Sequence, residues 1–190
     1  MEYRNKANRS APHVCPYWRA FALDNWIRKL IQSPRKILEP YIRAGDTVID
    51  LGCGPGFFTN EMARLVGPFG KVVAVDLQSK MLAQMHRKAG KQGLKERITP
   101  HQCEADRINL ECKADFILAY YMVHETPDPK NFFAQVKALL KLDGRLLVVE
   151  PRIHVSRKMF NHFVEITRSL GLKTVDFPKG KGGYSVLVAL

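Results

Sequence analysis

The sequence predicts an α/β protein in which helices cover both faces of a mainly parallel β-sheet, giving three layers. From residue 47 onward, short apolar runs rich in β-branched residues alternate with helical patterns, which is typical of βαβ units. Several of these runs lack polar alternation, as expected for strands covered on both sides. The last two runs are joined only by "KGKGG", too short for a helical crossover, so the sheet should finish in an antiparallel hairpin.

Each element follows from its local pattern. The predicted strands are residues 47–51, 71–76, 97–102, 115–121, 145–151, 172–178 and 184–190. The helices after residue 47 are centred on Met62, Met81, Phe133 and Phe163. Short polar residues that can cap a first turn mark the helix starts at Ser33, Ser79, Asp128 and Ser156. Glycines that accept the left-handed conformation mark two helix ends, at Gly90 and Gly171.

Length and composition bound the organisation of the chain. Its 190 residues, of which 46% are hydrophobic, are the size of one globular domain. We expect residues 1–46 to form an N-terminal helical cap or lid and residues 47–190 to form the main domain. Within the cap, residues 17–31 have aromatic and basic side chains at helical spacing. Such a helix could wall a substrate site, pack against the sheet edge or rest on a membrane surface.

Charge and cysteine usage restrict the partners. The formal net charge of +12 and the pI near 9.7 favour an anionic partner, such as nucleic acid, but name none. The four cysteines lack zinc-ligand spacing, so we expect free thiols, no metal site and a reducing compartment. No secretory h-region or membrane-length apolar stretch is present, so the chain is predicted to be cytoplasmic, with its oligomeric state left open.

The segment "VIDLGCGPGFFT" (residues 48–59) predicts a ligand site. Glycines 52, 54 and 56 allow a sharp turn at the carboxyl end of a strand and a close approach of ligand to the main chain. The spacing is not G-x-G-x-x-G, because Phe57 stands where the third glycine would be. An acid at the start of the turn, Asp50, suits a ligand with a positive charge.

A second acid follows at the end of the next strand. Asp76 lies twenty residues beyond Gly56, where a carboxylate can accept hydrogen bonds from both hydroxyls of a ribose. Two acids around a glycine turn therefore indicate an adenosine that carries an amino-acid cation.

These two segments and three further ones, taken in their order along the chain, make the sequence resemble the class I S-adenosylmethionine-dependent methyltransferases over roughly residues 47–190. They are "VIDLGCGPGFFT", "VVAVDLQSKML", "CEADRINL", "ADFILAYYMVHETPD" and "LLKLDGRLLVVEP", followed by the hairpin. The resemblance implies a Rossmann-like methyltransferase sheet, S-adenosyl-L-methionine as cofactor and S-adenosyl-L-homocysteine as product.

The resemblance also implies roles for individual residues. Asp50 and Gly52 would lie near the methionine amino group of the cofactor, and Asp76 at the ribose hydroxyls. The other implied cofactor residues are Cys53, Gly54 and Gly56 in the loop, Leu77 and Met81 against the adenine, Ala105 and Asp106 at its exocyclic amine, and Tyr120. The family often has Gly-Asp-Ala where this chain reads Ala-Asp-Arg.

The methyl acceptor should bind at the end of the fourth strand, where "AYYMVHE" supplies Tyr121, His124 and Glu125 as candidate catalytic residues. Transfer from a sulfonium mainly needs alignment and exclusion of water. A base is needed only for a protonated nucleophile, and His124 or Glu125 could serve. His124 could instead cap the following helix or pair with Glu125. Glu150 and Pro151, at the end of the fifth strand, either face the substrate or only form a turn.

Three functions remain open. Methylation of a small molecule is favoured by the near absence of insertions after the fourth and fifth strands. Methylation of RNA or protein agrees with the charge, but the Asn/Asp-Pro-Pro-Tyr motif that holds a flipped base amine is missing. The third function is that of a non-catalytic partner subunit that binds S-adenosylmethionine.

Overall fold

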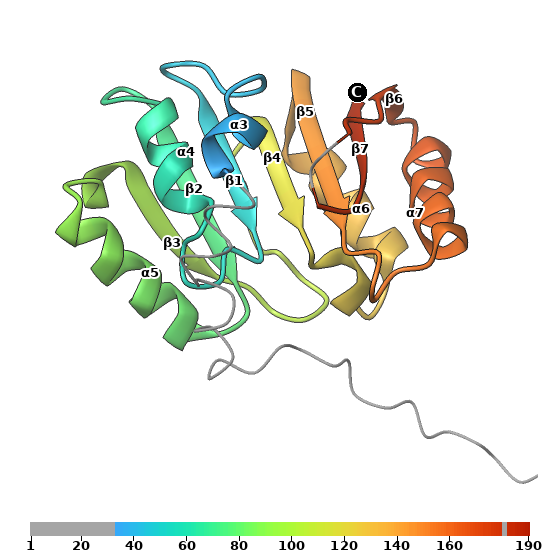
Figure 1. Cartoon of the computed structure of the whole chain (residues 1–190), viewed down its shortest axis with the longest axis horizontal. Coiled ribbons are helices and arrows are strands. Elements are labelled where there is room, and N and C mark those ends of the chain that lie inside the picture. The colour runs from blue at the N-terminus through green and yellow to red at the C-terminus, as the bar shows by residue number, and fades with distance from the viewer. Residues whose placement is uncertain (1–32, 180–181) are drawn as a thin grey trace, which may run out of the picture.

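A computed structural model describes residues 33–179 and 182–190, which form one seven-stranded sheet flanked by helices (Figure 1). The strands are β1 (Thr47–Leu51), β2 (Lys71–Asp76), β3 (Ile98–Gln102), β4 (Ala114–Tyr120), β5 (Leu140–Glu150), β6 (Lys173–Asp176) and β7 (Tyr184–Ala189). The α-helices are α3 (Pro34–Leu38), α4 (Thr59–Leu65), α5 (Ser79–Lys91), α6 (Pro129–Leu139) and α7 (Arg157–Ser169). Two short 3₁₀ helices, η2 (Lys95–Arg97) and η3 (Val123–Glu125), complete the set.

The strand order is β3-β2-β1-β4-β5-β7-β6, and the first five strands in that order are parallel. Strand β7 runs antiparallel to both β5 and β6, so the predicted C-terminal hairpin is confirmed. The order reverses direction between β1 and β4. In parallel α/β sheets, a crevice for ligands opens beyond the carboxyl ends of the strands at such a reversal.

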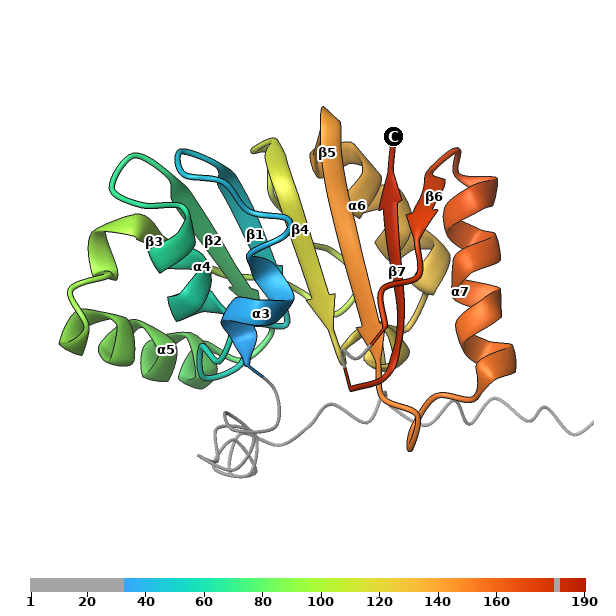
Figure 2. The same ribbon diagram turned by 45° about the horizontal axis from the view of Figure 1, so that its top comes forward.

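Two apolar cores cover the two faces of the sheet. One joins alternate strand residues such as Val48 and Leu118 to the buried sides of α3, α4 and α5. The other joins their neighbours, such as Ile49 and Ile117, to α6 and α7. Successive strand residues point to opposite faces, which is why the strands are apolar throughout. Figure 2 shows the resulting three layers, as the sequence predicts.

Several element ends differ from the predicted ones. Strand β5 begins at Leu140 rather than residue 145, because Leu140 pairs with Ala114 before a β-bulge. Strand β4 ends at Tyr120, since Tyr121 has a positive φ of 60° that turns the chain out of the sheet. Helix α5 continues past Gly90 to Lys91, so the expected stop at Gly90 is wrong.

The other predicted helix ends agree with the structure in part. The Asp128 side chain accepts hydrogen bonds from two backbone N–H groups at the start of α6, and Ser156 accepts one at the start of α7. After α7, Gly171 has a φ of 83°. Ser33 flanks α3 without a side-chain cap, and Ser79 is the first residue of α5 rather than its cap.

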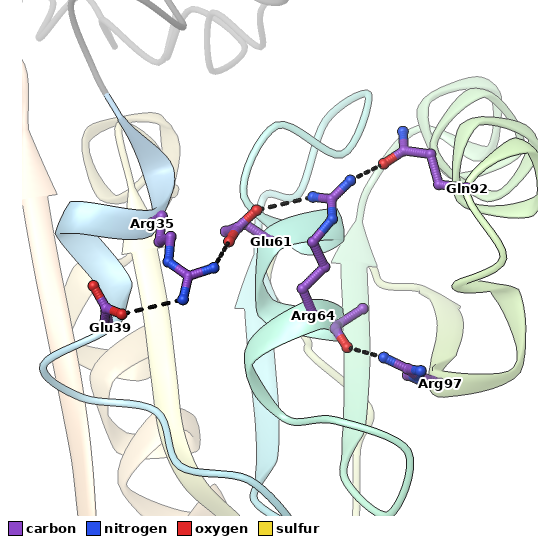
Figure 3. Close-up of polar contacts among 7 residues, drawn as sticks. Arg35, Glu39, Glu61, Arg64, Gln92 and Arg97 are labelled. Atoms are coloured by element: carbon purple, nitrogen blue, oxygen red, sulfur yellow. Dashed lines mark hydrogen bonds and ion pairs between the residues drawn. The ribbon is translucent and has the colours of Figure 1, made fainter.

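A polar network ties together the helices on the α3–α4–α5 face (Figure 3). Glu61 of α4 lies 3.8 Å from Arg35 of α3 and accepts a 2.9 Å hydrogen bond from Arg64. Arg64 also donates to Gln92 at the end of α5, and Arg97 donates to the carbonyl of Ala63 at 3.0 Å. The network therefore joins segments that are far apart in the sequence.

The expected helix at residues 17–31 lies outside the described residues. Among the described residues, no helix is long and apolar enough to cross a bilayer. The same part of the chain contains no cluster of metal-ligating side chains.

Candidate active site

A cleft of about 1080 Å³ opens beyond the carboxyl ends of β1, β2, β4 and β5. These ends lie at the lower edge of the sheet in Figure 2. The walls come from the glycine loop after β1, the end of β2, residues 103–108, the segment after β4 and residues 151–154 after β5. All predicted cofactor and catalytic residues except Gly56 line this cleft. Of the two residues left open at the end of β5, Pro151 lines it and Glu150 does not.

The glycine loop leaves room for a ligand at one position. Gly52, Gly54 and Gly56 all have positive φ, between 51° and 88°. A Cβ on Gly54 would meet no atom within 4 Å, and Gly54 lines the cleft. A Cβ on Gly56 would lie 2.7 Å from Cγ of Met85, so Gly56 allows α5 to pack closely rather than lining the cleft. Gly54 and Gly56 thus serve different purposes.

Asp50 lies at the end of β1 with only 2% of its surface exposed. Its Oδ2 accepts a 2.6 Å hydrogen bond from the hydroxyl of Thr59, the first residue of α4. Burial raises the pKa of Asp50 to about 7, against the lowering effect of the Thr59 hydrogen bond; the charge of Asp76 adds to the rise. Among the described residues no cationic side chain pairs with Asp50, so a positive ligand group beside it would favour its ionised form.

Asp76, at the end of β2, fastens the loop to the neighbouring strand. Its Oδ2 accepts a 2.8 Å hydrogen bond from the backbone N–H of Gly54, and its Oδ1 accepts one of 2.8 Å from Gln78. Burial raises its pKa, and these backbone hydrogen bonds oppose the rise. Asp76 also lines the cleft, so one carboxylate both orders the loop and faces the ligand space.

The residues that the resemblance assigns to the adenine lie on another part of the cleft wall. Leu77, Met81, Ala105 and Asp106 all line the cleft. The carbonyl of Asp106 accepts 2.8 Å hydrogen bonds from the side chains of Asn131 and Gln135 of α6. Gln135 in turn accepts a hydrogen bond from the backbone N–H of Ile108 at 2.8 Å. Helix α6 therefore holds the segment around Asp106 in place.

An aromatic wall lies between the loop and the end of β4. The ring of Tyr120 is 4.4 Å from that of Phe58 and 4.3 Å from that of Tyr121, measured between centroids. The Tyr121 hydroxyl donates a 2.8 Å hydrogen bond to the carbonyl of Gly182. Cys53, in the glycine loop, is also buried, and burial holds the pKa of its thiol well above its usual range. These side chains give the cleft an apolar middle.

His124, which lines the far end of the cleft, is paired with a buried carboxylate that does not itself line it. Glu150, at the end of β5, has no exposed surface. Its Oε1 accepts a 2.9 Å hydrogen bond from the backbone N–H of Val123, and its Oε2 accepts one of 2.5 Å from Nδ1 of His124. Burial opposes protonation of His124, but the hydrogen bond and charge of Glu150, with the charge of Glu125, raise its pKa.

The prediction that His124 could cap the next helix or pair with Glu125 is wrong. Asp128 caps α6, and the carboxylate hydrogen-bonded to His124 is Glu150. The rings of His124 and His154 also stack, with centroids 5.8 Å apart. Glu125 and Tyr121 line the cleft beside them.

Sequence reasoning missed two residues that shape the site, Thr59 and Gln135, and it also missed the pairing of Glu150 with His124. A signal for Thr59 was its position nine residues after Asp50, at the first turn of a helix aimed at the loop. Glu150 carried a weaker signal, as an acid at the end of an apolar strand. Its partner could not be read from the chain, because His124 lies 26 residues away, in η3 after another strand.

Comparisons with known proteins agree with this geometry. A family profile described as a methyltransferase domain matches residues 42–179. A demethylmenaquinone methyltransferase of Lactobacillus johnsonii is 27% identical over 180 residues, which cover 89% of this chain and 71% of that protein. A ubiquinone/menaquinone biosynthesis C-methyltransferase of Pasteurella multocida is 29% identical over 126 residues, or 64% of this chain and 47% of that protein. The matched region thus spans about half the length of that second relative.

A solved structure supports the same assignment. A S-adenosylmethionine-dependent methyltransferase from Aquifex aeolicus superimposes with a TM-score of 0.80 at 26% identity, over 92% of this chain and 97% of that one. Since the family profile covers more than half of the chain, and since the sheet order and the glycine loop agree with it, the chain belongs to the methyltransferase-domain family, as a class I enzyme whose cofactor is S-adenosylmethionine.

Proposed function

We propose that the protein transfers the methyl group of S-adenosylmethionine to a small molecule that binds beside His124. The observation that carries this proposal is that one cleft is lined both by the glycine loop with Asp50 and Asp76 and by His124, which is hydrogen-bonded to the buried Glu150. Cofactor and acceptor could therefore meet within a single space, as in-line methyl transfer requires.

The residues of the loop end of the cleft fit the cofactor. The open space at the missing Cβ of Gly54 allows a ligand to approach the main chain. Asp76 offers a carboxylate to the ribose hydroxyls, and Asp50 offers a buried acid for the methionine ammonium group. Leu77 and Met81 provide an apolar surface for the adenine. When bound, the cofactor supplies an electrophilic methyl group on a positively charged sulfur.

The chain's own residues orient the acceptor and exclude water. Phe58, Tyr120 and Tyr121 form an aromatic wall between the two ends of the cleft, which suits a flat, largely apolar acceptor. The relatives named for demethylmenaquinone and ubiquinone biosynthesis act on quinone-type molecules by name. We therefore propose a small aromatic, quinone-like acceptor for this chain.

The net charge of +12 favours a second candidate, methylation of RNA. This candidate predicts that RNA accepts the label and that RNA binding weakens steeply with salt. The small-molecule proposal predicts neither result.

The test incubates the purified full chain with methyl-labelled cofactor and three separated acceptor pools: solvent-extracted small molecules, total RNA and total protein. Label in the small-molecule pool, lost in an Asp76→Ala chain, would support the proposal. Label confined to RNA or protein would replace it by the second function. No transfer to any pool, despite tight cofactor binding, would favour a non-catalytic partner subunit.

A further inference from the structure

We infer that Glu150 is a positioning residue, which holds His124 in the tautomer whose Nε2 takes a proton from a hydroxyl of the methyl acceptor. This inference rests on the proposed function and deepens it, because it restricts the acceptor to molecules whose nucleophilic group is protonated at neutral pH, such as phenols and hydroquinones.

The burial of Glu150 argues for a specific purpose. A carboxylate with no exposed surface is unfavourably desolvated unless hydrogen bonds compensate it. Both of its oxygens are compensated by two consecutive residues, through the backbone N–H of Val123 and the ring of His124. Glu150 thus holds both the backbone at Val123 and the side chain of His124 in the segment after β4.

The surrounding backbone is built to keep this arrangement. Tyr121 has a φ of 60°, a left-handed conformation that is strained for a non-glycine residue. Its hydroxyl is bonded to the carbonyl of Gly182 in the β6–β7 hairpin. The next residue, Gly183, packs so closely that a Cβ there would lie 2.0 Å from the carbonyl oxygen of Glu150. Strain of this kind persists where surrounding contacts over-determine it, often at functional sites.

The hydrogen bond defines the tautomer of His124. A carboxylate can only accept, so Nδ1 carries the hydrogen in the 2.5 Å contact with Glu150. In the neutral ring, Nε2 is then the nitrogen with a free lone pair. Among residues 33–179 and 182–190, nothing hydrogen-bonds to Nε2, and the His124 side chain lines the cleft. The ring of His154 stacks on that of His124, with an angle of 10° between the ring planes.

The charges facing His124 favour its role as a proton acceptor. Glu150 from β5 and Glu125 from η3 both stabilise the imidazolium form, while Asp128 at the start of α6 and His154 after β5 line the same end of the cleft. The raised pKa makes Nε2 a stronger base. It also means that the basic form is populated only as pH rises above that pKa, so turnover should increase with pH through this range.

The step balances without a further reactant. The O–H bond of the acceptor breaks and its proton moves to Nε2 of His124. The electron pair released on the acceptor, at the oxygen or at a conjugated ring carbon, forms the new bond to the methyl carbon. Where the carbon attacks, the hydrogen on that carbon then moves to the oxygen by tautomerisation, which restores the aromatic ring. The bond from that carbon to sulfur breaks, and its pair stays on sulfur in S-adenosylhomocysteine. Glu150 stabilises the imidazolium until the proton passes to water.

The experiment uses the full chain and Glu150→Gln, with Asp115→Asn as the matched control. Like Glu150, Asp115 accepts one hydrogen bond from a backbone N–H, that of Thr47, and one from a side chain, that of Lys141. Unlike Glu150, it lies at the amino ends of the strands, away from the cleft. Nitrogen-detected NMR reports the tautomer and pKa of His124, assigned with His124→Gln. We expect the Nδ1–H tautomer in the wild type and the control, and a mixed tautomer with a lower pKa in Glu150→Gln.

Label transfer to the accepting small-molecule fraction is the second readout. We expect Glu150→Gln to reduce turnover by roughly 10²-fold and to leave cofactor affinity unchanged. The acidic limb of the pH–turnover profile should move to lower pH. Equal turnover with an unshifted limb would overturn the inference. An Nε2–H tautomer in the wild type would overturn it even if the variant does not fold. Failure of the wild type to label any small molecule would instead reject the proposed function, while the tautomer still reports on Glu150.

Discussion

At the residue scale, burial determines how Asp50 responds to pH. Its pKa lies at about 7 in the folded chain, against 3.8 for an ordinary aspartate. The folded state therefore binds more protons than the unfolded state between these values, so the free energy of unfolding should fall as pH rises through that window. Asp50→Asn keeps an acceptor for Thr59 but cannot ionise.

We expect the wild type to lose more stability than Asp50→Asn between about pH 4 and about pH 7. Urea denaturation of both proteins at the two pH values measures the difference. Parallel losses in the two proteins would show that Asp50 is ionised at an ordinary pKa.

Asp76 combines two duties, and one substitution removes both. In Asp76→Ala, the N–H groups of Gly54 and Gln78 lose their acceptor, and the proposed ribose contact disappears. We expect cofactor affinity to fall by roughly 1.5–3 kcal/mol and the chain to lose about 1–3 kcal/mol of stability. The control is Ser156→Ala, which removes the cap of α7 for about 1 kcal/mol and should not change affinity. Calorimetry showing unchanged affinity in Asp76→Ala would exclude the ribose role.

Gly54 and Gly56 provide a matched pair, because both have positive φ but face different surroundings. Alanine at Gly54 adds a methyl group in open space within the cleft, whereas alanine at Gly56 places one 2.7 Å from Met85. Each change costs about 1–2 kcal/mol for its backbone conformation. We expect Gly54→Ala to weaken cofactor binding with a modest loss of melting temperature. Gly56→Ala should lose more melting temperature, and the opposite ranking would contradict these assignments.

The acids of the site could be predicted because strand ends in a parallel sheet meet at one edge. Asp50 and Asp76 end adjacent strands, so their proximity follows from topology alone. The pairing of Glu150 with His124 could not, because it depends on how far β4 and β5 slide past one another and on the left-handed turn at Tyr121. Neither feature leaves a periodic pattern in the sequence.

At the element scale, the strands were predictable where apolar runs are long and central. The first half of β5 was not, since "KLDG" has the composition of a turn. It becomes a strand only because Leu140 pairs with Ala114 across a bulge. The end of α5 was misplaced for a similar reason. A mid-helix glycine is tolerated when packing on the sheet holds the helix, and Gly93, with a φ of 67°, follows the actual end.

The network around Glu61 makes a prediction about helix docking on the α3–α4–α5 face. The Glu61 side chain is 15% exposed, while Arg35 and Arg64 are about half exposed, so solvent screens the pairs. We expect Glu61→Gln to lower the free energy of unfolding by about 0.5–1 kcal/mol at low salt, and by less at high salt. Glu165→Gln, in an exposed pair with His162, should have almost no effect. A loss in Glu61→Gln that does not change with salt would mean that packing, not charge, ties these helices together.

At the scale of the whole molecule, the cleft lies between two halves of one sheet. The loop after β1 and the end of β2 belong to one half, and the segments after β4 and β5 belong to the other. A ligand in the cleft contacts both halves, so its binding energy adds to the cooperative stability of the fold rather than to one loop.

We therefore expect the cofactor to stabilise the entire chain by mass action. At a concentration one hundred times its dissociation constant, S-adenosylmethionine should add about 2.7 kcal/mol to the free energy of unfolding. For a chain of this length, that corresponds to a rise in melting temperature of roughly 5–10 °C. The whole transition should move without broadening, because no part of the sheet melts separately. Calorimetric scans at increasing cofactor concentration measure the shift, with Asp76→Ala scanned at the same concentrations. An equal shift in both proteins would mean that the ligand binds elsewhere. A second transition whose temperature does not change with cofactor concentration would mean that the two halves unfold independently.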